Sequence, residues 1–370
     1  MARNIIATLR DKLFRQIPVW SIAVPLYAWS MLAWNGTADS SILIVLQTAG
    51  LLGSVMAAVH QAEVIAHRVG EPFGTIVLAI AVTLIEVALI ASLMHSGGAE
   101  ATALARDTVF ATVMIILNGI IGLCLIVGGI RHREQSFSLE GVSASLTTLT
   151  AITILTLILP NYTLTVPGPY YGTSQLIFIA TVSFLLYSTF LFVQTVRHRD
   201  YFLPDGKGQK NDRHVPPPTL FITLISAVLL LISLAIIVLL AKTLSPVIED
   251  GVIRSGAPKA LVGIIIAAVV LLPEGIAAVR AAQKNRLQTS LNLAIGSALA
   301  TIGLTIPAVA VVSIYTQMPL TLGIDGKSTV LLFLSLFITS IALRTGRTTV
   351  LQGAVLLVIF AVYLFITVVP

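Results

Sequence analysis

The sequence predicts an all-α polytopic membrane protein with about eleven transmembrane helices, built as two inverted five-helix repeats plus one N-terminal helix. Three observations lead to this fold class. Of the 370 residues, 56% are hydrophobic and only 10% are charged, and the mean hydropathy is +0.98, whereas a soluble protein averages about 25% charged residues. The apolar residues form long runs separated by short polar loops. Two of these runs, roughly half a chain apart, carry a glutamate near their centre.

The apolar runs define the predicted spans, because a helix needs about 20 apolar residues to cross the hydrocarbon core of a bilayer. Windows of that kind lie at about 17–34, 41–59, 72–95, 106–130, 141–160, 173–196, 219–241, 258–282, 288–314, 328–343 and 348–369. The segment 1–40 begins with basic residues and shows no clear small-residue cleavage site, so we expect its apolar run to be retained as an extra first span.

The positions of Lys and Arg predict the orientation, since these residues are enriched in cytoplasmic loops. With a cytoplasmic N-terminus, five of the 22 Lys and Arg residues lie on the outer side, namely Arg106, Lys242, Arg254, Lys259 and Lys327, and the others lie on the inner side. The net charge of +6 is therefore explained by orientation in the membrane. It does not predict nucleic-acid binding.

A short pattern recurs in the two halves and predicts an internal repeat. The sequence RVGEP at 68–72 leads to Glu86, and RSGAP at 254–258 leads to Glu274. On the predicted topology the first of these spans runs outward and the second inward, as in the inverted repeats of secondary transporters. Chance recurrence of a short pattern is the alternative. The predicted parts are a first repeat at 41–196, a flexible cytoplasmic linker at 197–218 and a second repeat at 219–370.

Glu86 and Glu274 are the only acids placed centrally in a predicted span, and no Lys, Arg or His is central in any span. A charged side chain at mid-bilayer depth costs several kcal/mol and indicates a functional site. Two facing carboxylates without a basic partner cannot both stay ionised in a dry site. Either each takes a proton or the pair takes a cation, and that competition is sufficient for exchange.

Further ligands are needed if the pair binds a hard cation, because Ca²⁺ takes six to eight oxygens. Pro273 and Gly275 flank Glu274 and predict a local break at 271–275 that would turn backbone carbonyls toward the ion. The polar candidates on the same or companion spans are Thr83, Thr112 and Ser297, followed by Asn292 and Asn118. For each of them alone, a hydrogen bond to the helix backbone is the alternative role.

Titratable residues also lie near the predicted span ends. Glu63, His67 and Glu71 are placed at the cytoplasmic mouth, and Glu249 and Asp250 at the external one. These groups can attract cations or relay protons, and histidine titrates near neutral pH. Ordinary solvated loop charges are an equal alternative.

At these residues the chain resembles the calcium:cation antiporter superfamily, and most closely its ChaA-type calcium/proton and sodium/proton members from bacteria. The likeness covers nearly the whole chain. The segments that carry it are HRVGEPFG, VTLIEVALI, RDTVFATVMII, LLPEGIAAVRAAQKNRLQTSLNLAIGSALATIGLTIPAV and RTGRTTVLQGA. The resemblance implies a multi-pass protein of a bacterial inner membrane, with Glu86 and Glu274 in the ion site and Glu63 near the cytoplasmic mouth. Pro273 matches the proline–glutamate pair of the superfamily.

The chain also departs from that pattern. Many relatives have Asn three residues before each glutamate, where this chain has Thr83 and Leu271, and Ala111-Thr112 replaces a Gly-Ser pair. Fewer side-chain oxygens argue against strict calcium selectivity and leave room for sodium or potassium. We therefore expect exchange of Ca²⁺, with Na⁺ or K⁺ as further substrates, for H⁺ by alternating access. The alternatives are monovalent-only Na⁺(K⁺)/H⁺ antiport and a cation channel.

Enzymatic activity is not expected, because H-E-x-x-H, G-x-S-x-G and P-loop motifs are absent from the sequence. A carrier of small organic solutes would need aromatic and basic residues in mid-span, which the sequence lacks. The expected partners are the lipid bilayer and the transported cations and protons, with no cofactor. Nothing in the sequence indicates an oligomeric state.

Overall fold

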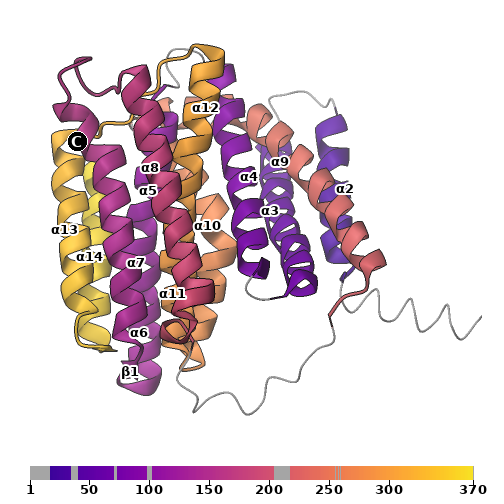
Figure 1. The fold of residues 1–370 in the computed structure, drawn as a ribbon. Helices are drawn as coiled ribbons and strands as arrows, with labels where there is room; N and C mark the ends of the chain where they lie inside the picture. The colour runs from indigo at the N-terminus through magenta and orange to yellow at the C-terminus, as the bar shows by residue number, and fades with distance from the viewer. Residues whose placement is uncertain are drawn as a thin grey trace, which may run out of the picture. The chain divides into compact units, whose positions relative to one another are not determined.

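The computed structural model is helical almost throughout (Figure 1). It describes residues 17–34, 41–70, 73–97, 102–203, 217–254, 256, 258 and 260–369. Seven helices are uninterrupted, namely α2 (Trp20–Ala33), α3 (Ser41–Val69), α4 (Phe73–Gly97), α9 (Leu220–Arg254), α10 (Ala260–Gln283), α13 (Gly326–Ala342) and α14 (Val350–Val368). Four longer runs contain a π-helical or 3₁₀ segment.

The first of these composite runs joins α5 (Leu104–Met114), the π-helical η2 (Ile115–Ile120) and α6 (Ile121–His132). The second joins α7 (Leu139–Thr153), the π-helical η3 (Ile154–Ile158) and the 3₁₀ segment η4 (Leu159–Tyr162). The third joins α8 (Thr173–Phe192) and the π-helical η5 (Val193–Arg197), and the fourth α11 (Leu287–Ala300), the π-helical η8 (Thr301–Thr305) and α12 (Ile306–Thr316).

The described helices confirm the predicted fold class, an all-α membrane protein with inverted five-helix repeats after one N-terminal helix. In the part of the chain that the structure describes, eight helical runs are long and apolar enough to cross a membrane. Shorter apolar stretches are α2, residues 79–92 within the longer helix α4, and α13. Apolar runs of this length form helices because a bilayer offers no water to satisfy free backbone groups.

The chain divides into two compact units. The first comprises residues 1–92 and 213–248, and the second comprises 93–212 and 249–370. In the first unit α2 packs closely on α3. The Val24 side chain lies against Gly53, where there is no space for a Cβ atom. The buried amide of Gln61 donates a 2.9 Å hydrogen bond to Ser21 Oγ across the same pair of helices. A small apolar cluster of Ile17, Val64 and Ile222 joins α3 to α9.

The second unit is built around the α5–η2–α6 run, in whose apolar window 89% of the residues are buried. Helices α10, α11 and α14 all pack against this run. The approach of α14 to α6 is close because glycines face each other there. A Cβ placed on Gly353 would lie 2.7 Å from the Gly122 carbonyl oxygen and 2.8 Å from the Ile126 nitrogen. Small residues at helix crossings are the usual basis of packing in membranes.

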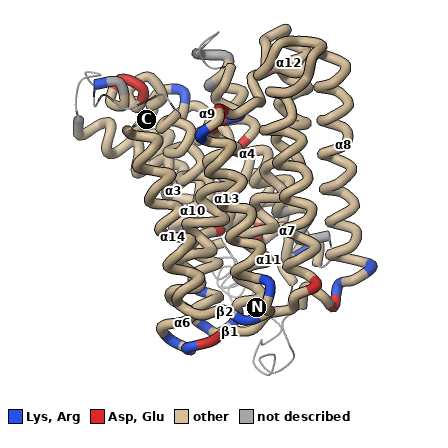
Figure 2. The backbone as a smooth tube through the Cα atoms, turned by 90° about the vertical axis from the view of Figure 1, so that its left-hand side faces the viewer, with Lys and Arg blue, Asp and Glu red and all other residues tan. Residues whose placement is uncertain are grey.

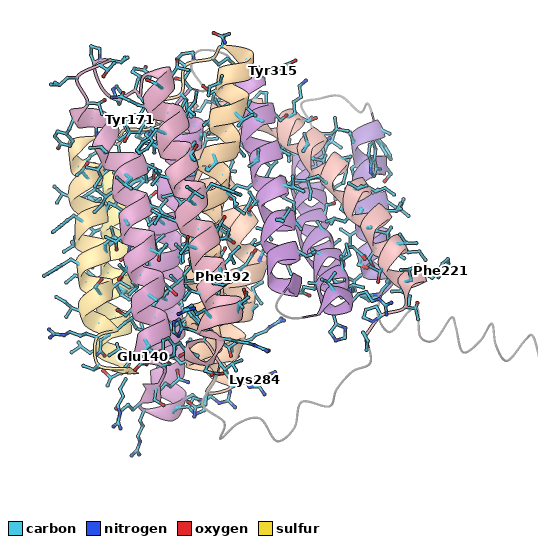
Figure 3. All side chains as sticks on the ribbon, viewed as in Figure 1. Glu140, Tyr171, Phe192, Phe221, Lys284 and Tyr315 are labelled. Atoms are coloured by element: carbon cyan, nitrogen blue, oxygen red, sulfur yellow. The ribbon has the colours of Figure 1, made fainter. Side chains whose placement is uncertain are left out.

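The two ends of the second unit differ in chemistry. At one end lie Tyr171, on the loop before α8, and Tyr315, in the last turn of α12, and Glu140 and Lys284 lie at the opposite end (Figure 3). The latter end carries a short antiparallel pair of strands, β1 (Gln135–Ser136) and β2 (Arg347–Thr348). Lys and Arg gather around these strands and the end of α6 (Figure 2). Since β1 follows α6 and β2 precedes α14, the strand pair holds these two helices in register.

Several predicted helix ends are wrong. The span predicted at 41–59 continues as α3 to Val69, and the one at 219–241 continues as α9 to Arg254, through Pro246. The predictions followed the apolar core alone, whereas the polar turns beyond it keep the helical hydrogen bonding. By contrast, the short window at 328–343 is a helix of 17 residues, α13, which begins where Asp325 Oδ1 accepts a 2.9 Å hydrogen bond from Ser328 N.

The predicted flexible linker at 197–218 also needs a correction at its start. Residues Arg199–Tyr201 form the 3₁₀ segment η6, and the Phe202 side chain is buried with its ring 5.9 Å from that of Phe190. The Phe202 carbonyl accepts a 2.6 Å hydrogen bond from Asn292. These residues therefore belong to the folded part of the chain. Residues 204–216 of the linker, and Glu71, lie outside the described residues.

Candidate functional site

Glu86 lies in α4 of the first unit, and only 1% of its surface is exposed. The helix is apolar around it, with Ile85 and Leu89 buried on either side. Thr83, one turn earlier, is also buried at 7% exposure, which places its hydroxyl on the same side of the helix as the carboxyl group. An acid buried at this depth in an apolar helix is rare in membrane proteins and marks a candidate functional site.

Glu274 lies in α10 of the second unit and is partly buried. The predicted break at 271–275 is wrong, because α10 is a continuous helix from Ala260 to Gln283 with Pro273 inside it. A proline in a helix removes one donor, so the Val269 carbonyl loses its usual partner, but the flanking hydrogen bonds still hold the helix together. Gly275 faces η2, where an added Cβ would lie 3.3 Å from Ile120.

The helical run that follows each glutamate-bearing helix contains a π-helical turn, at a similar separation along the sequence from the glutamate. The turn η2 begins 29 residues after Glu86, and η8 begins 27 residues after Glu274. Such turns are rare in α-helices and occur frequently at functional sites, because the wider turn disturbs the regular hydrogen bonding. Sequence analysis missed both turns. The available signal was a glycine inside each apolar run, Gly119 and Gly303.

The two glycines explain how the π-helical turns pack. A Cβ on Gly119 would contact the Phe360 ring at 3.4 Å, and one on Gly303 would lie 2.6 Å from the Cβ atom of Tyr187. Every residue of η2 is buried. The irregular backbone therefore lies inside protein, which is where a membrane protein tolerates it.

The predicted supporting residues have different surroundings. Thr112 is buried in α5, next to α10, whereas Ser297 is partly buried in α11, which also packs on α10. Asn118 is fully buried in η2 and donates a 2.8 Å hydrogen bond to Ser335 Oγ. The Asn118 side-chain oxygen is buried without a hydrogen-bond partner among the described residues. A buried amide oxygen of this kind, within a π-helical turn, can accept a hydrogen bond or bind a cation.

Asn292 is engaged elsewhere. Its side-chain nitrogen donates to the Phe202 carbonyl, and its oxygen accepts a 2.9 Å hydrogen bond from Gln288. The Gln288 oxygen in turn accepts a 2.6 Å hydrogen bond from the Ser138 nitrogen. This chain of hydrogen bonds joins α11 to the segments before α7 and after α8.

The residues predicted at the two mouths lie on helix ends. Glu63 and His67 are exposed on the last turns of α3, and Glu63 lies 3.8 Å from His60, with 57% of its side chain exposed. On the last turn of α9, Glu249 is partly buried and Asp250 is exposed. All four thus lie on helices, and three of them, Glu63, His67 and Asp250, are exposed as ordinary solvated charges would be.

A polar cluster that sequence analysis missed lies where α5 begins. Arg106 Nε contacts Asp107 Oδ1 at 2.7 Å, and Arg106 Nη1 donates a 3.0 Å hydrogen bond to the Gly323 carbonyl. Together with Asp325 and Tyr363, these residues line a cavity of 160 Å³. The sequence signal was the Arg-Asp pair directly before an apolar run. Because Arg106 links α5 to the loop before α13, it ties together segments from the two halves of the chain.

No group of three or more His, Cys, Asp or Glu side chains suited to a metal ion occurs among the described residues. Each of the helices α4 and α10 carries one central carboxyl group, and hydroxyl or amide oxygens lie on turns of the same or neighbouring helices. Such groups can hold a proton or bind a weakly held cation.

Comparison with known proteins places this arrangement in context. The sodium/calcium exchanger protein family matches residues 40–196 and 225–369. The chain is 49% identical over 361 residues to the protein y4hA of Sinorhizobium fredii, covering 96% of this chain and 97% of that one. It is 33% identical over 350 residues to the sodium-potassium/proton antiporter ChaA of Escherichia coli, covering 93% and 94% of the two chains. The solved structure of the H⁺/Ca²⁺ exchanger CAX has a similar fold, with a TM-score of 0.71 at 17% identity over 96% of this chain and 88% of that one.

Proposed function

Because this chain belongs to the sodium/calcium exchanger family, as a ChaA-type member of the calcium:cation antiporter superfamily, we propose that it exchanges Ca²⁺, and also Na⁺ or K⁺, for H⁺ by alternating access. Members of this family are multi-pass transporters of the membrane, and no catalytic residue is proposed. The observation that carries the proposal is the burial of Glu86, at 1% exposure, in an apolar helix, together with Glu274 in the corresponding helix of the second half.

Glu86 and Glu274 are proposed to form one shared site for cation and proton. Two protons, one Ca²⁺ or two monovalent ions neutralise two carboxylates equally well. The loaded site then has no net charge in either state, which lowers the cost of moving it through an apolar surrounding. An empty, doubly ionised site carries two charges, so reorientation without a bound ion is disfavoured. This difference would couple cation movement to proton movement.

The supporting ligands are proposed to come from helices that neighbour the acids in the repeats. Thr83 precedes Glu86 by one helical turn, and Thr112, Ser297 and the Asn118 oxygen are further sources of neutral oxygens. Pro273 and Gly275 are proposed to act on the backbone around Glu274, since proline leaves one carbonyl without its helical donor. Asn292 is the weakest candidate because both ends of its amide are hydrogen-bonded.

Monovalent-only antiport is a second candidate. Thr83 and Leu271 stand three residues before the two glutamates, so the site has few side-chain oxygens for a cation that takes six to eight ligands. The name of the Escherichia coli relative, a sodium-potassium/proton antiporter, favours the same alternative.

The proposal is tested by measuring proton movement in inverted membrane vesicles loaded with a fluorescent pH indicator. The vesicles are acidified, and Ca²⁺, Na⁺ and K⁺ are added in turn. Recovery of the pH signal with Ca²⁺ is expected, and recovery with only the monovalent ions would select the second candidate. Cation flux without any proton counter-movement would indicate a channel and contradict both.

We expect Glu63→Gln to slow exchange by less than about fivefold. The Glu63 side chain is 57% exposed, and an exposed carboxylate at a mouth contributes roughly 1 kcal/mol or less through attraction of the cation. The initial rate of pH recovery measures the effect, with Glu134→Gln, another exposed acid, as the control. Complete loss of exchange in Glu63→Gln would mean that the primary site lies at Glu63.

The orientation with a cytoplasmic N-terminus stays a prediction from the distribution of Lys and Arg. Under that orientation Glu63 and His67 are proposed to act at the cytoplasmic mouth, and Glu249 and Asp250 at the external one. Reaction of single cysteines introduced at these four exposed or partly exposed positions with a membrane-impermeant thiol reagent distinguishes the two sides. Cys124 does not interfere because it is buried.

A further inference from the structure

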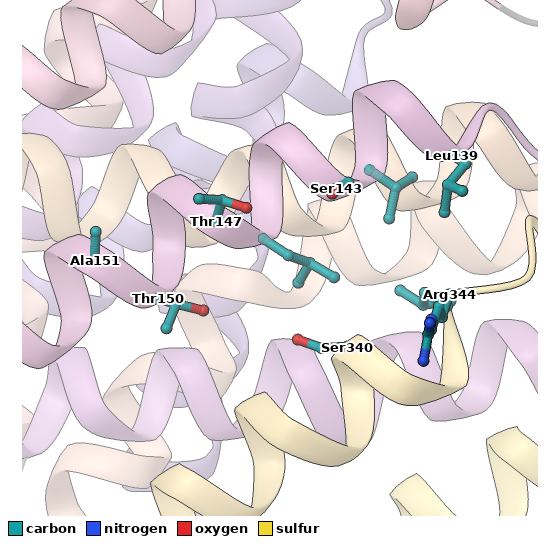
Figure 4. A pocket seen from close by; sticks show the side chains of 10 residues that line it. Leu139, Ser143, Thr147, Thr150, Ala151, Ser340 and Arg344 are labelled. Atoms are coloured by element: carbon teal, nitrogen blue, oxygen red, sulfur yellow. The ribbon is translucent and has the colours of Figure 1, made fainter.

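A groove of 510 Å³ lies between α7 and α13 in the second unit (Figure 4). It follows α7 from Leu139 to Ala151, and α13 and the residues after it contribute Ser340 and Arg344. Apart from Arg344, all lining side chains are aliphatic or carry a hydroxyl group. Since this part of α7 belongs to an apolar membrane span, the groove opens toward the hydrocarbon region.

The length of the groove corresponds to one leaflet of a bilayer. Twelve residues separate Leu139 from Ala151, which at a rise of 1.5 Å per residue gives about 18 Å. Half of a hydrocarbon core of about 30 Å is roughly 15 Å. A groove that begins at an arginine beyond the helix end and runs this far inward has the dimensions of one lipid acyl chain.

The charge at the groove's outer end selects the head group. Arg344 is exposed, and its guanidinium has no ion-pair partner among the described residues. Arg347, three residues later, differs because it pairs with Glu134 at 3.5 Å. An unpaired guanidinium at the membrane surface binds phosphate well, since its planar donors match two phosphate oxygens. Basic pockets between transmembrane helices bind anionic lipid head groups in this way.

We propose that this groove binds one anionic phospholipid of the surrounding bilayer, with its phosphate on Arg344 and one acyl chain between α7 and α13. Ser143, one turn inward from Leu139, can donate a hydrogen bond from its hydroxyl to an ester carbonyl of the lipid. Because α7 belongs to the first half of the chain and α13 to the second, the bound lipid contacts both halves.

Native mass spectrometry of the purified full chain, titrated with phosphatidylglycerol or with zwitterionic phosphatidylcholine, tests the proposal. We expect the first phosphatidylglycerol to bind more tightly than the first phosphatidylcholine. Arg344→Gln should weaken phosphatidylglycerol binding roughly fivefold, which is the contribution of one basic residue at a membrane surface. It should weaken phosphatidylcholine binding less, because the choline ammonium offsets the charge of the phosphate that Arg344 contacts. Arg131→Gln is the matched control, because Arg131 is exposed at the same end of the unit and lies outside the groove.

A second variant tests the acyl-chain position. Thr147→Phe places a ring in the groove and should weaken binding of both lipids, whereas Thr181→Phe, on the exposed face of α8, should not. Circular dichroism verifies that each variant is folded. Equal phosphatidylglycerol binding by Arg344→Gln and the unmodified protein would overturn the proposal. So would a second copy of the chain that occupies the groove, detected as a dimer that Thr147→Phe dissociates.

Discussion

Replacing either Glu86 or Glu274 by glutamine is expected to reduce proton-coupled cation exchange to the background level while leaving the protein folded. Glutamine has nearly the same shape as glutamate, but it cannot release a proton or carry a negative charge at neutral pH. A site in which glutamine replaces the glutamate therefore loses both proton release and cation binding at that position. The measurement is the initial rate of pH recovery in vesicles on addition of Ca²⁺, Na⁺ or K⁺.

Stability should respond in the opposite direction to transport. Glu86 is buried at 1% exposure, and a buried ionisable group in an apolar helix is kept at the expense of stability. We expect the thermal unfolding midpoint of Glu86→Gln in detergent to be unchanged or higher. Glu140→Gln is the control, because Glu140 is an exposed acid at the start of α7. Normal exchange by either Glu86→Gln or Glu274→Gln would contradict the proposed shared site.

The second large effect is expected at the crossing of α6 and α14. Gly353→Ala should lower the free energy of unfolding by about 1–3 kcal/mol, the usual effect of overpacking. The added Cβ would lie 2.7 Å from the Gly122 carbonyl oxygen and 2.8 Å from the Ile126 nitrogen. Both atoms belong to the backbone, so the two helices must separate, and the dispersion contacts along their whole interface weaken.

Gly251→Ala is the matched control for Gly353→Ala. It separates the cost of overpacking at the helix crossing from the general preference of helices for alanine over glycine. Gly251 lies in α9, and an added Cβ there would meet no atom within 4 Å. Gly251→Ala is therefore expected to leave stability unchanged or to raise it by up to about 1 kcal/mol. The thermal unfolding midpoint of each variant is measured in detergent, with size-exclusion chromatography as the readout of folded protein. Equal midpoints for the two variants would show that the α6–α14 crossing adapts without loss.

The candidate site was partly accessible from the sequence. The two glutamates stand out because they are acids in apolar runs, and this contrast is local. The roles of the amides were not accessible, since Asn292 bonds a carbonyl 90 residues earlier and Asn118 bonds a serine 217 residues later. Arg106 similarly donates a hydrogen bond to the Gly323 carbonyl, so this residue links two distant segments in addition to carrying a charge.

The sequence by itself determined the class of the protein, the approximate number and place of its spans, and the two acids inside apolar runs. Hydropathy is a property of neighbouring residues, and a bilayer forces any long apolar run to be helical. Only the tertiary structure decided where α3 and α9 end, that α10 continues through Pro273, and that π-helical turns occur at 115–120 and 301–305. These features depend on contacts such as Gly303 against Tyr187, which join segments far apart in the chain and leave no local pattern.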